Sequence, residues 1–100
     1  MALFQEKVWA LLKQIPRGKI TTYAAIARAL GNPKAARAVG NSCNKNPFSP
    51  CIPCHRVVCS NGTIGGYAKG AQKKIALLGR EGIRIKKSKV LDFNEKLFKF

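Results

Sequence analysis

Three prolines within seven residues divide this chain into two parts. Pro47, Pro50 and Pro53 each lack a backbone N–H and hold φ at about −65°, so neither a helix nor a central strand passes through them. We therefore expect a rigid extended loop here. It delivers the two residues that follow it, Cys54 and His55, and His55 is the only histidine in the chain.

A cysteine beside a histidine is a candidate pair for nucleophilic chemistry. The thiolate is the attacking form of cysteine, and an imidazole that takes the thiol proton, directly or through a water molecule, generates it at neutral pH. Adjacent side chains on a strand point to opposite faces, but a turn brings them together, and Pro53 favours a turn. Cys54 and His55 are therefore the first candidates for catalysis.

The charge of the chain narrows the class of partner. Lys and Arg number 19 against 4 Asp and Glu, which gives a net charge of +15. Such a surface attracts polyanions, and nucleic acid is the commonest of them because phosphate contacts supply affinity that does not depend on sequence. The basic residues are spread along the chain rather than gathered on one amphipathic helix, so we expect no membrane partner.

The sequence also predicts the compartment. No apolar run approaches the length of a membrane span, and the N-terminus lacks the pattern of a signal peptide. We expect a cytoplasmic protein, associated with the nucleoid, or a nuclear one if the source is eukaryotic. The four cysteines are accordingly expected to be free thiols.

Apolar spacing, capping residues and terminating glycines predict a mainly helical chain. The expected helices cover residues 4–15, 24–30, 32–44 and 71–81, and the apolar tail after residue 90 is expected to dock as a further short helix. Thr21 or Thr22 caps the second helix, and Asn32 followed by Pro33 opens the third. A turn at residues 60–63 between extended segments at 56–59 and 64–67 predicts a small β-hairpin.

The second and third predicted helices are short and joined by a glycine turn, as in a helix-turn-helix. The third carries Lys34 and Arg37 outward, and its small residues, among them Ala38 and Gly40, leave room for a partner to approach the backbone. A recognition helix in a basic protein fits this pattern. Ordinary helix packing with solvated basic residues fits it about equally well.

The cysteine cluster has three other interpretations. Residues 51–55 match the C-x-x-C-H pattern of haem attachment, but the chain shows no export signal. A C-x-x-C redox pair requires a strand-to-helix context, which is not predicted here. A zinc site would use Cys51, Cys54, His55 and Cys59, whose spacing is too compressed for the usual structural sites. None of these explains the basic charge, so we expect no metal and no cofactor.

Several segments together match one protein family, in order and in register from about Phe4 to Gly82. They are Thr22-Tyr23, residues 31–40, Asn46-Pro47, residues 52–58, Gly62 with 65–67, residues 74–78 and Glu81-Gly82. These segments resemble the O6-alkylguanine-DNA alkyltransferases. Pattern and resemblance together predict a mainly α fold: a winged helix-turn-helix-like three-helix DNA-binding domain with a small β-hairpin and an additional C-terminal helix.

The resemblance implies a suicide methyltransferase that repairs DNA. After base flipping, Cys54 takes a methyl or larger alkyl group irreversibly from O6 of guanine, with O4 of thymine as a further substrate. Glu81 orients His55, and His55 draws the proton from the thiol through a water molecule. By the same resemblance, Asn46 joins the helix-turn-helix to the cysteine loop.

The resemblance also implies a monomer bound to the minor groove of double-stranded DNA. Arg37 fills the gap left by the extruded base, Tyr23 crowds the flanking phosphate and contacts the guanine, and the Ala68 amide lies near O6. The residues expected at the substrate and the DNA are Tyr23, Lys34, Arg37, Ala38, Gly40, Val57, Tyr67 and Ala68.

The chain departs from the family pattern in three respects. Many members carry an N-terminal α/β domain, whereas we expect residues 1–100 to form a single catalytic and DNA-binding domain. Ala68 replaces a serine of some members, and Ser49 replaces a proline that lines their pocket. A related class, the alkyltransferase-like proteins, flips damaged guanines without repairing them and has tryptophan at the cysteine position. That class is the alternative function, and Cys54 argues against it.

Overall fold

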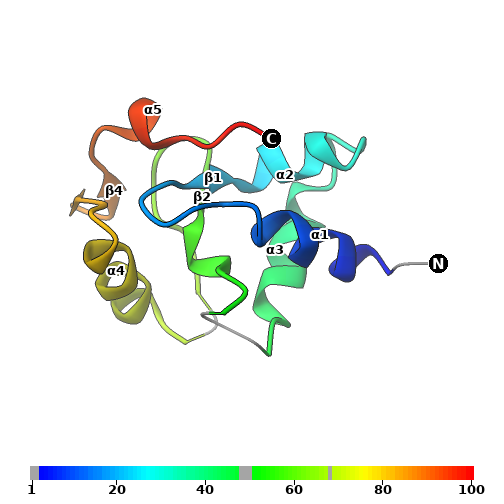
Figure 1. Cartoon of the computed structure of the whole chain (residues 1–100), viewed down its shortest axis with the longest axis horizontal. Helices are drawn as coiled ribbons and strands as arrows, with labels where there is room; N and C mark the ends of the chain where they lie inside the picture. Colours follow the sequence, from blue (N-terminus) through cyan, green and yellow to red (C-terminus); the bar gives the residue numbers. More distant parts are fainter. Residues whose placement is uncertain (1–2, 48–50, 68) are drawn as a thin grey trace.

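Helices supply most of the regular structure (Figure 1). The computed structural model describes residues 3–47, 51–67 and 69–100. Its helices are α1 (Phe4–Leu12), α2 (Tyr23–Ala29), α3 (Ala36–Asn44), the 3-10 turn η1 (Cys54–Arg56), α4 (Ala71–Arg80) and α5 (Phe93–Lys96). Its strands are β1 (Thr21–Thr22), β2 (Val57–Val58), β3 (Ile85–Lys86) and β4 (Lys89–Val90). The predicted mainly α class is confirmed.

The first three helices form one packed unit. Their apolar faces share a core that contains Val8 and Leu12 of α1, Ile26 of α2 and Val39 of α3, all fully buried. The indole nitrogen of Trp9 also donates a hydrogen bond of 2.9 Å to the Ser42 carbonyl, which ties α1 to α3. α3 is therefore packed against both α1 and α2.

Three of the predicted helix boundaries are confirmed in detail. Thr22 caps α2 by accepting a 3.0 Å hydrogen bond from the Ala25 N–H, and Gly31 ends that helix at a φ of +78°. Gly82 follows the end of α4 with a φ of +84°. Both glycines adopt the left-handed conformation that other residues rarely take.

Two of the predicted helices are longer than the observed ones. α1 ends at Leu12, and the chain continues through turns to Ile15. α3 starts at Ala36 rather than at Asn32, because the Ala35 N–H bonds the Asn32 carbonyl at 3.0 Å and closes a separate turn. Proline at the second position suits such a turn as well as it suits a helix start. Lys34 therefore lies before α3 and not on it.

A short parallel ladder joins the two parts of the chain. Thr21 pairs with Val57 and Thr22 with Val58, so the strand that leads into α2 lies beside the strand that follows the cysteine loop. A second core, which includes Ile20, Val58 and Leu78, packs against this ladder. The ladder therefore places the helix-turn-helix next to the residues around Cys54.

The hairpin prediction was wrong in its location. Residues 59–63 do turn, with the Cys59 N–H donating to the Thr63 carbonyl at 2.8 Å, but Thr63 then bridges to Lys89 of β4 and not to the strand before the turn. The small hairpin is β3–β4, whose turn residues Lys87 and Ser88 have φ of +52° and +64°. Such a turn usually uses Asn or Gly, so Lys-Ser gave no sequence signal.

No helix in the described part of the chain is both long and apolar enough to cross a membrane.

Candidate active site

η1 brings Cys54 and His55 into the interior of the molecule. The turn is closed by the Arg56 N–H, which donates to the Pro53 carbonyl at 3.0 Å, directly after the proline-rich loop. Cys54 is 3% exposed and His55 is 1% exposed. A turn, rather than a strand, therefore places the thiol and the imidazole on the same segment in a buried environment.

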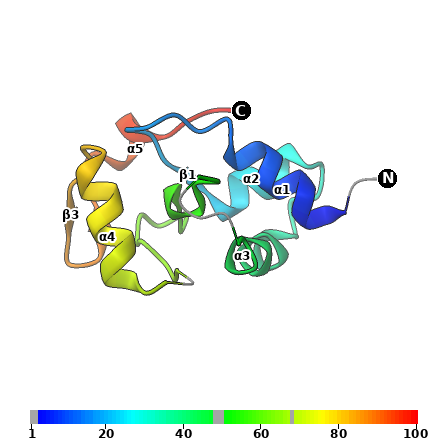
Figure 2. The same cartoon turned by 60° about the horizontal axis from the view of Figure 1, so that its bottom comes forward.

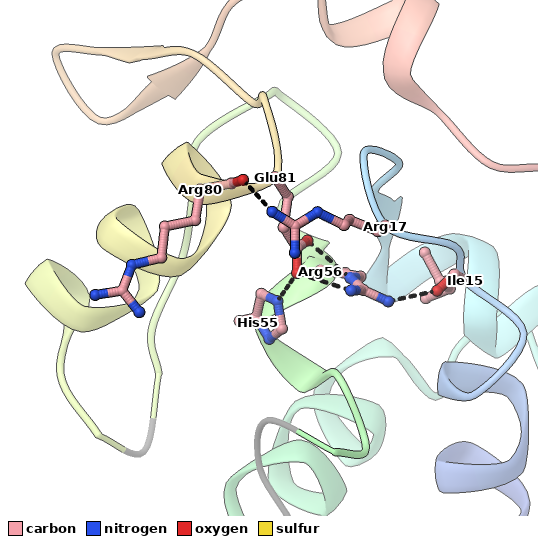
Figure 3. A network of polar contacts seen from close by, with 6 residues as sticks. All are labelled: Ile15, Arg17, His55, Arg56, Arg80 and Glu81. Atoms are coloured by element: carbon pink, nitrogen blue, oxygen red, sulfur yellow. Dashed lines mark hydrogen bonds and ion pairs between the residues drawn. The ribbon is translucent and has the colours of Figure 1, made fainter.

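Glu81, at the C-cap of α4, lies against the imidazole. His55 Nε2 is 3.0 Å from Glu81 Oε2, and the carboxylate is almost fully buried (Figure 3). A proton on Nε2 that is donated to the carboxylate leaves Nδ1 as the basic nitrogen. His55 Nδ1 is buried and forms no hydrogen bond with any residue that the structure describes. The imidazole therefore has one nitrogen oriented by Glu81 and one available to accept a proton.

Arg56 holds Glu81 from the other side and was missed in the sequence. Its Nε donates to Glu81 Oε1 at 2.8 Å, and a terminal nitrogen donates to Oε2 at 2.7 Å. Its other terminal nitrogen donates to the Ile15 carbonyl at 2.7 Å, which anchors the network to the turn after α1 (Figure 3). A two-pronged arginine clamp fixes the plane of a carboxylate, so Glu81 has one orientation in which to meet His55.

The ionisation of this network favours a neutral base. Burial lowers the pKa of His55 below its usual value, and the hydrogen bond with Glu81 only partly opposes that effect. Burial alone would raise the pKa of Glu81, but hydrogen bonds from Arg56 and His55 outweigh it and keep that pKa below its usual value. Near neutral pH the site therefore holds a carboxylate beside an uncharged imidazole.

A buried lysine supports the opposite side of the site. Lys74 of α4 is fully buried, and its Nζ donates to the Val57 carbonyl at 2.7 Å and to the Gly66 carbonyl at 3.1 Å. It also lies 5.9 Å from the centre of the Tyr23 ring. Burial lowers its pKa to about 8. The periodicity of α4 could have revealed Lys74, because it stands four residues before the buried Leu78.

Tyr23 and Cys43 remain protonated in these surroundings. Burial raises the pKa of Tyr23, and the negative charge that nearby thiolates would carry raises it further, so the side chain stays a phenol. Burial likewise raises the pKa of Cys43 to about 12. Cys43 is thus an inert thiol, whereas Tyr23 keeps a hydroxyl that can donate.

A groove of about 420 Å³ opens between α2, α3 and the glycine pair at 65–66. Tyr23, Arg37, Gly40 and Cys59 are among the residues that line it. Gly65 is required there, because its φ is +71° and a side chain would press on the Cys59 sulfur at 3.2 Å. The groove has the position and the size to admit a flat ring beside Tyr23.

The other predicted DNA-contacting residues lie in different surroundings. Ala38 is exposed on α3, and Lys34 is exposed in the preceding turn. Val57 is fully buried in β2, and Tyr67 is half-buried against the main core. The prediction for Ala68, like the remark on Ser49, falls outside the described residues.

Asn46 connects α3 to the cysteine loop. It lies two residues after α3, and its Nδ2 donates a 2.7 Å hydrogen bond to the Ile52 carbonyl. The bond is buried, so its loss would leave polar groups unpaired inside the molecule. α3 and the segment that carries Cys54 are therefore fixed relative to each other.

The cysteines are free thiols. Among the described residues, no three or more His, Cys, Asp or Glu side chains come together in a way that could hold a metal ion.

Comparisons with known proteins agree with this geometry. Residues 3–83 match the family model described as 6-O-methylguanine DNA methyltransferase, DNA binding domain. A methylated-DNA–protein-cysteine methyltransferase of Methanosarcina acetivorans is 52% identical over 79 residues, which are 79% of this chain and 51% of the relative. The human protein of that name is 47% identical over 83 residues, which are 83% of this chain and 40% of its own length. The chain thus spans about half the length of the curated relatives it matches, or less.

Solved structures give two kinds of match. Mycobacterium tuberculosis OGT in complex with DNA is 43% identical with a TM-score of 0.78, over 82% of this chain and 50% of that one. S. pombe Atl1 in complex with damaged DNA containing O6-carboxymethylguanine is 33% identical with a TM-score of 0.87, over 100% of both chains. The family model covers most of the sequence and the relatives share about half of the aligned residues, so the chain belongs to the 6-O-methylguanine DNA methyltransferase family, as its motifs predict.

Proposed function

We propose that this protein repairs O6-alkylguanine in double-stranded DNA by moving the alkyl group irreversibly to Cys54. The observation that carries the proposal is the ordered chain from Arg56 through Glu81 to His55, next to a buried thiol. A nucleophile, a base and a group that orients the base are the parts that thiol alkylation requires. The names of the curated relatives support the same chemistry.

The reaction follows from the protonation states of the site. His55 Nδ1 takes the thiol proton of Cys54 through a water molecule, and Glu81 stabilises the imidazolium that forms. The Cys54 sulfur attacks the alkyl carbon, a new S–C bond forms, and the C–O6 bond breaks with its electron pair moving onto the base. The base recovers a proton and becomes guanine, and we assign that transfer to the phenol of Tyr23, which keeps its proton. The thioether does not revert, so each molecule reacts once.

The target base reaches the thiol only outside the helix. O6 of a stacked guanine lies on the major-groove edge, whereas Cys54 is buried, so the nucleotide must be flipped out. The groove beside Tyr23 receives the base, and the exposed Arg37 on α3 fills the space that it leaves. The small exposed side chain of Ala38 and the absent one of Gly40 suit close approach to the minor groove. We also propose that the protein acts as a monomer. Its expected location is the cytoplasm, at the nucleoid, or the nucleus if the source is eukaryotic.

A mass measurement tests the proposal. The protein is incubated with a duplex that contains one O6-methylguanine, and its intact mass is then recorded. We expect a gain of one methyl group per protein, located on Cys54 by peptide mapping, and no gain for Cys54→Ser. A protein that binds the lesion tightly and keeps its mass contradicts the proposal.

The second candidate function is lesion binding without transfer. The similarity to S. pombe Atl1, solved in complex with damaged DNA and matched with a TM-score of 0.87, favours it. The nucleophile at position 54 favours transfer instead. The same mass measurement decides between the two functions, and the affinity for the damaged duplex measured in parallel shows whether the lesion was bound.

A further inference from the structure

A second groove, of about 590 Å³, lies between α2 and the C-terminal segment. Its walls include Ala25 and Arg28 of α2 and Phe98, Lys99 and Phe100 of the tail. The family model ends at residue 83, so the tail that forms one wall lies beyond the matched region. The proposed repair chemistry uses none of these residues.

The tail is held in place by the main ladder. The Ile20 N–H donates to the Lys96 carbonyl at 2.9 Å, and the Phe98 N–H donates to the Ile20 carbonyl at 2.7 Å. Leu97 thereby extends the β1–β2 ladder as a parallel bridge to Ile20. Beyond this bridge, the rings of Phe98 and Phe100 meet edge to face with centroids 5.3 Å apart. The aromatic wall is therefore fixed to the fold although it stands near the end of the chain.

The surface of this groove is aromatic and basic. Phe100 is 43% exposed and Phe98 is half-buried, so both rings remain within reach of a ligand. Arg28 and Lys99 are exposed at the groove and form no ion pair with any described residue, and no acidic residue is among those that line it. Flat aromatic rings between unpaired cations are the surface that single-stranded nucleic acid binds, by base stacking and phosphate contacts.

The groove and the recognition helix lie on different sides of the molecule. In both views the C-terminal segment runs along the upper edge, whereas α3 lies in the lower half, on the other side of the β1–β2 ladder (Figures 1 and 2). We therefore expect a duplex on α3 to leave the tail groove open. The groove also differs from α3 in its chemistry, because α3 presents small residues and Arg37 but no phenylalanine.

We propose that this groove, formed by α2 and residues 93–100, is a second nucleic-acid site that binds a single-stranded segment. Bases stack on Phe98 and Phe100, and the adjoining phosphates contact Arg28 and Lys99. An acidic peptide would satisfy the two cations equally well, but it would not use the flat faces of the rings. Single-stranded nucleic acid uses both features, so the observations favour it.

Binding of fluorescein-labelled dT10 tests the proposal. The Cys54→Ser protein is first saturated with a short unlabelled duplex, so that α3 is occupied, and dT10 is then added while anisotropy is recorded. We expect dT10 to bind in addition to the duplex. The logarithm of the affinity should fall with the logarithm of salt concentration with a slope of about −1.4, for two phosphates on a single strand.

Variants locate the site. Phe100→Ala should weaken dT10 binding at least fivefold, which corresponds to about 1 kcal/mol, the low end for loss of one stacked base. Arg28→Ala and Lys99→Ala should each weaken binding and make the salt slope shallower by about 0.7. Lys73→Ala removes an equal charge from the exposed side of α4 and should leave dT10 binding unchanged. All four changes, made in the chain that retains Cys54, should leave methyl transfer from a damaged duplex unchanged.

Three results overturn the proposal. They are unchanged dT10 affinity in the groove variants, displacement of dT10 by the duplex in a one-to-one exchange, and equal competition by a decaglutamate peptide. Photocross-linking with 5-iodouracil in the oligonucleotide gives a further readout. Adducts within residues 93–100 support the groove, and adducts confined to α3 contradict it. Failure of methyl transfer would leave these measurements valid, because they are made in a chain that cannot transfer.

Discussion

Arg56 and Arg37 carry the same charge in opposite surroundings. Arg56 is 16% exposed and donates three hydrogen bonds, two to Glu81 and one to the Ile15 carbonyl. The Arg37 side chain is exposed on α3 and forms no hydrogen bond or ion pair with any described residue. The reacting side of the site is completed when the chain folds, whereas the exposed Arg37 side chain is left for the DNA partner that we propose. Substitution of Arg56 should therefore mainly change the stability of the fold, whereas substitution of Arg37 should mainly change the repair of DNA.

Arg56→Ala should produce the largest loss of stability. It leaves the buried Glu81 carboxylate with His55 as its only described partner, and breaking a buried ion pair in this way costs about 3–5 kcal/mol. Urea denaturation measures the loss. Arg84→Ala is the matched control, because the Arg84–Asp92 pair is exposed and should contribute about 1 kcal/mol or less. Equal losses of stability in the two variants would contradict the prediction that the buried Arg56–Glu81 pair contributes more than the exposed Arg84–Asp92 pair.

Alkylation of Cys54 should produce the next effect. Cys54 is 3% exposed and belongs to the main core, so an added methyl group overpacks its surroundings at a cost of about 1–3 kcal/mol. For a domain of this size, each kcal/mol lowers the melting temperature by about 4–8 °C. Thermal scans before and after reaction with O6-methylguanine DNA measure the change. An unchanged melting temperature would show that the site has room for the product.

Acidification is a milder perturbation of the same side. Because burial lowers the pKa of His55 in the folded chain, the unfolded chain binds its proton more readily, with the ordinary value of 6.5. The free energy of unfolding should be constant above pH 6.5 and decline as the pH falls below that value. Methyl transfer should continue to lower pH, until the lowered pKa of His55 in the folded chain is reached. Urea titrations from pH 8 to pH 5 measure the decline.

The single histidine makes this experiment specific. In His55→Gln the decline just below pH 6.5 should disappear, because no other histidine is present and the pKa of Glu81 is itself lowered from 4.5. If the variant retains the same decline, another group is responsible.

Arg37→Ala should have the smallest effect on stability and a clear effect on DNA repair. Its exposed position predicts a change of at most about 0.5 kcal/mol in the free energy of unfolding. Repair of a duplex should slow at least tenfold, whereas transfer from the free O6-methylguanine base should be unaffected. Lys73→Ala serves as the control of equal charge on α4. Equal slowing on both substrates would place Arg37 in the chemistry rather than in extrusion of the base.

The sequence predicted best what is encoded locally. Helical spacing and capping residues located the four longer helices, and the family resemblance named His55 and Glu81, whose Nε2 and Oε2 atoms lie 3.0 Å apart. Residue patterns alone could not predict partners that are distant in the chain. Strands of two residues have no readable alternation, so the pairing of Thr21 with Val57 had no signal. The partner of Arg56 lies 25 residues further on, and its identity follows only from packing.

Lys74 illustrates a second limit. Lysine is rarely fully buried, so nothing in the sequence of this basic chain sets Lys74 apart from the lysines at the surface. In the fold, Lys74 occupies an inward-facing position of α4 that an apolar residue usually takes. Its ammonium group donates to two backbone carbonyls near Tyr23. Tertiary contacts decide such a case. A single charged residue among the inward-facing apolar positions of an amphipathic helix is a candidate for a buried charge with tertiary hydrogen bonds.

The one tryptophan of the chain has a practical consequence for experiments. Trp9 is half-buried on α1 and donates its indole N–H to the Ser42 carbonyl on α3, the helix proposed to meet DNA. A movement of α3 changes the polarity around this indole, so its emission is an intrinsic reporter on the recognition helix. Stopped-flow fluorescence could then follow binding, base extrusion and alkylation in unlabelled protein, and separate their rates within one experiment.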